Sequence, residues 1–147
     1  MKIGMIGIIF FVLFCLTGCS LERDNLLDPK GNSEVRIPPT PDRPTSVSSG
    51  RNIIVQWART EDAELVHHYN LYRGNNAHGP FHFIQNVPIA PDFNASMVTA
   101  VDETVVSGLT YFYRVSGVSP PVTGTNPPQG LEGRLSEHCG GVRAGGG

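Results

Sequence analysis

The sequence has little of several features that would place it in a common functional class. Only three cysteines occur among 147 residues, which excludes a disulfide-rich scaffold. The basic residues form no cluster and the formal net charge is −2, so the chain lacks the electrostatic footprint of a nucleic-acid-binding protein. No apolar run reaches the roughly 18 residues that a membrane-spanning helix needs. No stretch shows helical periodicity, so the sequence predicts no helical domain.

Motifs that carry chemistry are also missing. The chain contains no Gly-x-Ser-x-Gly nucleophile elbow and no Arg-Gly-Asp tripeptide. His67 and His68 are neighbours, so in a strand they should point to opposite faces and be unable to share a metal ion. His78 and His82 flank a predicted hairpin, which could bring them together, but we interpret them as solvated loop residues. We therefore expect no catalytic residue, no metal site and no cofactor, and a protein that is not an enzyme.

The N-terminus carries a targeting pattern. A charged start, a short apolar core at residues 3–16 and small residues at its exit are typical of a secretory signal peptide, here residues 1–18. The motif Leu16-Thr17-Gly18-Cys19 resembles the bacterial lipobox, in which a diacylglyceryl group is attached to the cysteine sulfur. The resemblance implies signal cleavage between Gly18 and Cys19 and lipidation of Cys19, a modification that needs a thiolate. An ordinary signal peptide with a chance cysteine is the alternative.

A lipidated cysteine would anchor the protein to a membrane of the cell envelope. Ser20 replaces the aspartate that retains such lipoproteins in the inner membrane of enteric-type bacteria, which favours the outer membrane where the host has two. Cys139 is then the remaining cysteine of the mature chain. We expect it to be a buried or half-buried thiol without a partner, with intermolecular pairing as the alternative.

Residues 19–41 are predicted to be the lipidated N-terminus and a flexible tether. The segment mixes charges of both signs with Gly31 and four prolines, and such a composition buries too little surface to offset chain entropy. The prolines should stiffen its second half. The stretch Asp24 to Pro29 resembles a short motif often found just after the lipobox.

Residues 42–144 are predicted to form an all-β domain, followed by a glycine tail at 145–147. Several short alternating stretches are separated by turn signals at roughly 8–12-residue spacing, which indicates a sandwich or barrel. Two sheets packed around Trp57 should bury most of the aromatic side chains. The alternation places Tyr69, Tyr111 and Tyr113 in the core with Trp57, and leaves Tyr72 and Phe112 as the outward aromatic residues that we can name.

The domain resembles a fibronectin type III domain. The features that carry this resemblance are the Pro-rich lead, Trp57 closing the second strand, the third-strand sequence YNLYR and the stretch VDETVVSGLTYFYRVSGVS. It implies an immunoglobulin-like antiparallel β-sandwich of about a hundred residues. In that family the tyrosine that opens the sixth strand, here Tyr111, forms a tyrosine corner by bonding to nearby backbone. The last strand contains Gly140 and Gly141, which weaken a strand interior.

The long loop at residues 119–133 is the predicted contact loop. Long loops in compact domains tend to be functional or disordered, and prolines lower the entropy lost on binding. Its candidate binding residues are Pro120, Pro121, Val122, Pro127, Pro128 and Leu131. We expect a lipid-anchored envelope protein that displays this domain for protein–protein interaction or adhesion. The alternative is a glycan-associated accessory domain of a carbohydrate-active envelope system, which an exposed aromatic row would favour.

Overall fold

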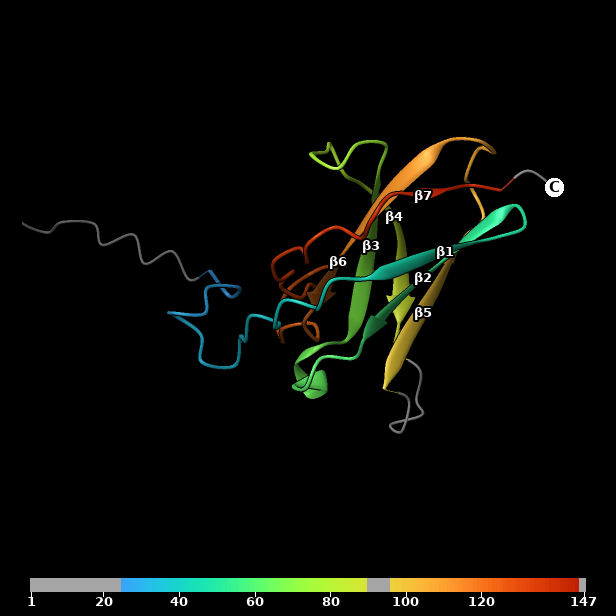
Figure 1. Ribbon diagram of the computed structural model, residues 1–147. Helices are drawn as coiled ribbons and strands as arrows, with labels where there is room; N and C mark the ends of the chain where they lie inside the picture. Colours follow the sequence, from blue (N-terminus) through green and yellow to red (C-terminus); the bar gives the residue numbers. More distant parts are fainter. Residues whose placement is uncertain (1–24, 90–95, 146–147) are drawn as a thin grey trace, which may run out of the picture.

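The computed structural model describes residues 25–89 and 96–145, which fold into two antiparallel sheets packed face to face (Figure 1). One sheet has the order β1-β2-β5, with β1 at Thr45–Ser49, β2 at Asn52–Ala58 and β5 at Met97–Asp102. The other has the order β4-β3-β6-β7, with β3 at His68–Gly74, β4 at His82–Pro88, β6 at Thr110–Val118 and β7 at Val142–Arg143. A 3₁₀ turn, η1 at Ala63–Leu65, lies between β2 and β3. The prediction of an all-β antiparallel sandwich is confirmed.

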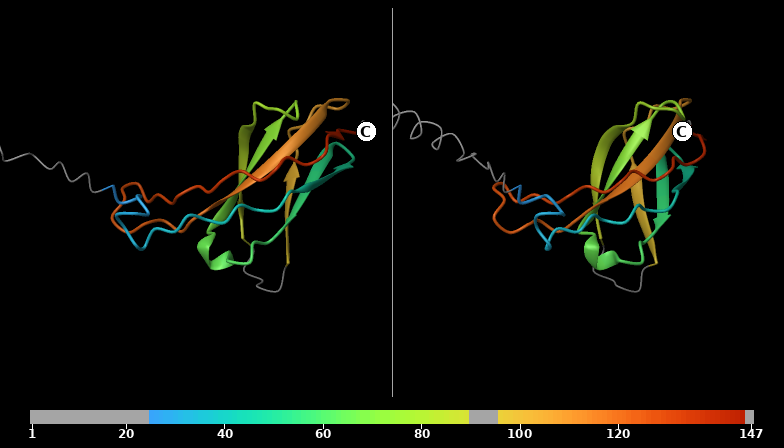
Figure 2. Two further views of the ribbon diagram at one scale, coloured as in Figure 1. Left: turned by 60° about the vertical axis from the view of Figure 1, so that its left-hand side comes forward. Right: turned by 90° about the vertical axis from the view of Figure 1, so that its left-hand side faces the viewer.

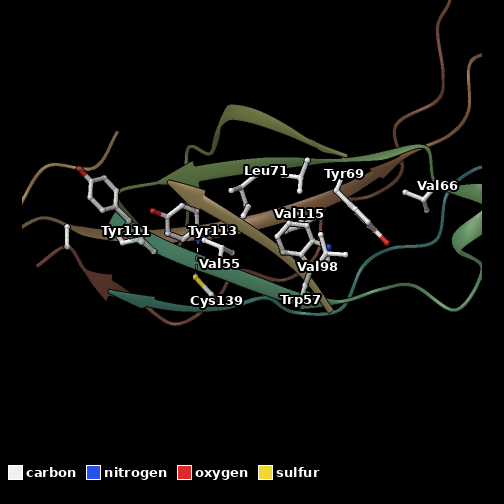
Figure 3. Packing of buried hydrophobic residues seen from close by; sticks show 14 residues of the cluster. Val55, Trp57, Val66, Tyr69, Leu71, Val98, Tyr111, Tyr113, Val115 and Cys139 are labelled. Atoms are coloured by element: carbon white, nitrogen blue, oxygen red, sulfur yellow. Dashed lines mark hydrogen bonds between the residues drawn. The ribbon is translucent and has the colours of Figure 1, made fainter. Parts of the chain in front are cut away.

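The core lies between the two sheets and contains the four aromatic residues that the alternation placed there (Figure 3). Trp57 is 1 % exposed, and its ring meets that of Tyr69 edge to face with the centroids 5.5 Å apart. Tyr111 and Tyr113 enter from β6, on the same face as Val115. Period-two alternation in β2, β3 and β6 therefore determines which side chains fill the space between the sheets.

The tyrosine corner is present. The Val106 amide donates a hydrogen bond of 2.9 Å to the Tyr111 hydroxyl, which fixes the turn that leads into β6. Gly108 in this turn has a φ of 84°, a left-handed conformation that favours glycine. The Ala144 carbonyl closes the same turn by accepting from the Gly108 amide at 3.0 Å.

The C-terminal edge of the second sheet is irregular, as its glycines suggested. Regular pairing with β6 is confined to the two residues of β7. Between residues 132 and 139 the chain still follows β6, and its amides donate to β6 carbonyls, but side chains accept from two β6 amides in return. The Val115 amide donates to Ser136 Oγ at 3.0 Å, and the Tyr113 amide donates to Cys139 Sγ at 3.1 Å. Cys139 is thus a buried free thiol with a structural role.

The second half of the N-terminal strap, residues 25–44, packs onto the domain as part of its structure. Val35 is 3 % exposed, and Pro38, Pro41 and Pro44 are buried. The predicted tether extended to residue 41, so packing against the sandwich begins earlier in the chain than the composition indicated. The predicted signal peptide, Cys19 and the last two tail glycines lie outside the described residues.

The core geometry predicts a large cost for truncating Trp57. We expect Trp57→Ala to lower the free energy of unfolding by about 3–5 kcal/mol, since a buried indole is replaced by a cavity. Chemical denaturation followed by circular dichroism measures this. Arg51→Ala, at an exposed turn position, is the control and should change stability by no more than about 0.5 kcal/mol. Equal stability of both variants would mean that Trp57 is not part of the core.

Candidate functional site

The proline loop, residues 119–133, forms an ordered extension at the end of the sandwich where the chain enters (Figure 2). Backbone hydrogen bonds join its two arms: the Val122 amide donates to the Gln129 carbonyl at 2.8 Å, and the Ser119 amide to the Leu131 carbonyl at 2.8 Å. Thr125 closes the tip, where its hydroxyl accepts from the Gln129 amide at 2.8 Å. Hydrogen bonding within the loop therefore gives this long connection a defined shape.

The predicted binding residues of the proline loop differ in accessibility. Four of them are exposed, namely Pro120, Pro121, Pro127 and Pro128. The other two, Val122 and Leu131, are half-buried. The N-terminal strap covers one side of the loop. A groove of about 280 Å³ between the two is lined by residues 34–36 of the strap, residues 64–65 and residues 119–123. The strap thus covers part of the loop that the sequence analysis predicted to be the contact surface.

A second candidate surface is the outer face of the β4-β3-β6 sheet. Tyr72 on β3 pairs with Phe83 on β4, and their rings meet edge to face at 5.8 Å. Nearer the C-terminal edge, the His138 ring stacks on Phe81 at 6.4 Å and meets Phe112 edge to face at 5.6 Å. We call Tyr72, Phe81, Phe83, Phe112 and His138 the aromatic face.

The aromatic face corrects the expectation that the sandwich buries most of its aromatic side chains. Phe83 is 51 % exposed, while Tyr72 and Phe112 are half-buried on the outer side, as alternation predicted. The pairing of β3 with β4 shifts between Leu71 and Tyr72, so that Tyr72 lies opposite Phe83. A bulge of this kind redirects side chains and cannot be located from hydrophobic period alone. A glycine at 74 leaves room for Phe81 to fold across β3, since a Cβ there would come within 3.2 Å of the Phe81 ring.

Arg114 adds a positive charge to the aromatic face. Its guanidinium carbon lies 5.4 Å from the centre of the Phe81 ring, a distance typical of a cation–π contact. Its Nε also donates to the Ser136 carbonyl at 2.6 Å, which fixes the direction of the side chain. Aromatic rings and arginine on one exposed face are the composition that is enriched at the energetic centres of protein interfaces.

A polar cluster borders the aromatic face on the side of the proline loop. Glu132 accepts hydrogen bonds from the Tyr72 hydroxyl at 2.6 Å and from the Ser116 hydroxyl. Burial by itself would raise the pKa of Glu132, but the hydrogen bonds from Ser116 and Tyr72 outweigh it and hold the pKa below its ordinary value. Glu132 is therefore a carboxylate that positions the Tyr72 ring.

The two adjacent histidines converge, contrary to the expected opposite orientation. His67 precedes β3, outside the pleated part of the chain, and its Nδ1 lies 3.0 Å from Nδ1 of His68. Burial and the neighbouring His67 lower the pKa of His68. In the described ranges, no three side chains of the His, Cys, Asp or Glu type are grouped so that they could hold a metal ion. No helix within residues 25–89 and 96–145 is long and apolar enough to cross a membrane.

A buried charge lies between the sheets: Asp102 is 3 % exposed. It accepts hydrogen bonds from Arg73 Nη1 at 2.9 Å, the Tyr113 hydroxyl at 2.9 Å and the Thr104 hydroxyl at 2.8 Å. Burial alone would raise the pKa of Asp102, but the bonds from Thr104, Tyr113 and Arg73 together lower it. Burial and the Asp102 charge also raise the pKa of Tyr113, so the phenol stays protonated. This cluster has a structural role, since its acceptor atoms are already used.

Comparison with known proteins identifies the architecture. The chain matches no protein-family model and no curated protein sequence. Among solved structures, it is similar to an Fn3-like protein from Clostridium thermocellum, with 22 % identity, a TM-score of 0.53, and coverage of 74 % of this chain and 95 % of that one. The fold is that of a fibronectin type III domain.

Two further solved structures are similar to this chain at lower TM-scores. A myokine structure has 16 % identity, a TM-score of 0.49, and coverage of 74 % of this chain and 98 % of that one. The twitchin kinase region from C. elegans has 13 % identity, a TM-score of 0.48, and coverage of 73 % of this chain and 17 % of that one. The fibronectin type III fold occurs in proteins with many roles, so function must be argued from the surfaces of this chain.

The Asp102 cluster predicts a dependence of stability on acid pH. Because the folded-state pKa of Asp102 lies below the value of about 3.9 expected in the unfolded chain, its contribution is present above that value. The contribution is lost as pH falls through the lowered folded-state pKa. We expect Asp102→Asn to reduce the free energy of unfolding at pH 7 by about 3 kcal/mol, since it leaves Arg73 without its carboxylate.

Urea denaturation of wild type and Asp102→Asn between pH 7 and pH 2.5 measures this effect. The difference between the two proteins should shrink as the pH falls. Glu103→Gln, at the exposed neighbouring carboxylate, is the matched control and should follow the wild-type curve. A difference that stays constant over the whole range would show that the charge of Asp102 does not stabilise the fold.

Proposed function

We propose that this protein is a lipid-anchored cell-envelope protein that displays one fibronectin type III domain to bind another protein. The observation that carries the binding role is the aromatic face. It presents Phe83 at 51 % exposure beside Tyr72, with Arg114 fixed nearby, on a sheet face that the described chain leaves open. Exposed aromatic patches of this kind mark contact sites, because burying them in an interface removes apolar surface from water.

The location of the aromatic face supports the same function. β3 runs from His68, beside the end where the chain enters, to Gly74 at the far end. Tyr72, Phe83 and Phe112 therefore lie in the half of the domain away from the strap. An anchor at Cys19 would leave this half accessible from the compartment that the domain faces. The proposed role of the domain is binding or adhesion, not catalysis. The outer membrane is the proposed site where the host has two membranes.

A glycan ligand is the second candidate for the aromatic face. Rings that are exposed along a sheet also suit stacking against the apolar faces of sugar rings, and a glycan-associated accessory role would use them in this way. Glu132 lies on the same face, is exposed, and could accept hydrogen bonds from hydroxyl groups. Retardation of the protein in gels that contain envelope polysaccharides would separate this candidate from a protein partner.

The lipid anchor makes a direct prediction. Cys19→Ser should abolish incorporation of a radioactive fatty acid, because the hydroxyl cannot replace the thiolate as the acceptor. Cys15→Ser is the matched control and should be labelled like wild type, since residue 15 belongs to the predicted signal peptide. Label retained on the Cys19→Ser protein would contradict the lipoprotein assignment.

The aromatic face predicts the outcome of partner capture. We expect the double variant Tyr72→Ser/Phe83→Ser to lower capture of a protein partner from envelope extracts by tenfold or more, the effect expected when residues at the centre of an interface are removed. A second variant replaces residues 122–129 of the proline loop by a short Gly-Ser turn and should bind as wild type. The opposite result, with binding lost only in the loop variant, would move the contact surface to the proline loop.

A further inference from the structure

The N-terminal strap and the proline loop form a single stalk that projects from the sandwich (Figure 2). Pro38 of the strap packs against two glycines at the base of this stalk. A Cβ on Gly133 would come within 2.6 Å of the Pro38 carbonyl oxygen, and one on Gly117 within 3.2 Å of the Pro38 ring. The close approach therefore depends on glycine at both positions, and it joins the stalk to the domain.

The end of the stalk is an ordered turn. The Asn25 and Asp28 side chains accept from the backbone amides two residues further on, at 3.1 and 2.9 Å. Asn32 Nδ2 donates to the Leu26 carbonyl at 3.0 Å, which closes the turn. Leu26 is 41 % exposed and lies beside the tip of the proline loop, its Cδ1 3.5 Å from the position that a Cβ on Gly124 would take. The turn and the loop tip thus present one surface.

This surface is uncharged over most of its extent. Residues 119–131 contain no acidic, basic or histidine side chain, and Pro120, Pro121, Pro127 and Pro128 are exposed. The adjoining strap residues 25–36 add two acids, Asp28 and Glu34, and two bases, Lys30 and Arg36, whose charges cancel. A surface of exposed leucine and proline without net charge suits an apolar or zwitterionic partner.

The chain itself brings such a partner close. Asn25 follows Cys19 by six residues, which span at most about 20 Å when fully extended. This step depends on the lipidation of Cys19 proposed above. With acyl chains buried in the bilayer at Cys19, the tip of the stalk cannot move farther than this span from the lipid headgroups.

We infer that the tip of the stalk, Leu26 together with the proline loop, rests on the surface of the phospholipid bilayer. Contact removes exposed apolar surface from water without burying a charge. The ordered turn holds the tip in shape, so little chain entropy is lost when it binds. The domain then stands with its stalk on the lipid, and the aromatic face lies in the half directed away from it.

A fluorophore sensitive to polarity tests this orientation on the acylated full-length chain in vesicles of phosphatidylethanolamine and phosphatidylglycerol. The probe is attached to a cysteine introduced at exposed Thr123 in the proline loop or, as the matched control, at exposed Asn75 between β3 and β4. We expect a blue-shifted emission that brominated lipids quench for Thr123→Cys, and a water-like emission without quenching for Asn75→Cys. Buried Cys139 should take up no label, which the wild-type chain checks.

A second variant tests whether the contact requires the uncharged tip. Leu26→Asp/Pro128→Asp in the Thr123→Cys background should lose the blue shift and the quenching while the acyl chains and the melting temperature are retained. Water-like emission at both probe positions, in a chain that mass spectrometry shows to be acylated, would overturn the inference. A chain without acyl groups would instead refute the proposed lipid anchor, so the two failures are distinguishable.

Discussion

The two sheets of this domain are joined by one buried carboxylate. Asp102 ends β5 in the first sheet, and its partners Arg73 and Tyr113 belong to β3 and β6 of the second. A buried carboxylate is costly unless donors surround it, so one arrangement of the two sheets that satisfies the charge is strongly favoured. Arg73 also lies over the Tyr111 ring, 4.9 Å from its centre. The ion pair and the tyrosine corner therefore stabilise the same end of the sandwich.

The opposite end is determined by close backbone packing. At the base of the stalk, the absence of side chains at Gly117 and Gly133 allows Pro38 to pack closely against the domain. Val35 is buried farther along the strap. The domain thus has one end that is tied by polar contacts and one that is covered by the N-terminal segment. The aromatic face lies nearer to the polar end, since Tyr72 and Phe83 are paired close to Gly74 at the end of β3 and Phe112 lies opposite Gly74. This separation leaves the face open while the stalk is occupied by contacts within the chain.

Sequence reasoning located the core because alternation depends on local spacing alone. It placed Trp57 and Tyr69 inside, and the family resemblance recognised Tyr111 as the tyrosine that opens the sixth strand. It could not place Phe83 outside, because the bulge beside Tyr72 arises from pairing between strands. The order of the strap was missed for a different reason. Asn25 and Asp28, followed by Pro29 and Gly31, form a local turn signal. The average composition of the segment conceals this signal.

A stalk that is packed onto its domain changes what an anchored module can do. A flexible tether of about twenty residues has a root-mean-square reach of roughly 25 Å and lets every face of the domain meet a partner. Here the strap loses that freedom on folding, through contacts such as that of Pro38 with Gly133. With the stalk on the lipid as inferred above, the orientation of the domain would be determined before a partner arrives, and binding would lose less entropy. With Cys19 as the proposed anchor, the faces away from the stalk become the ones that a partner in solution or on another surface can reach, and the aromatic face is among them.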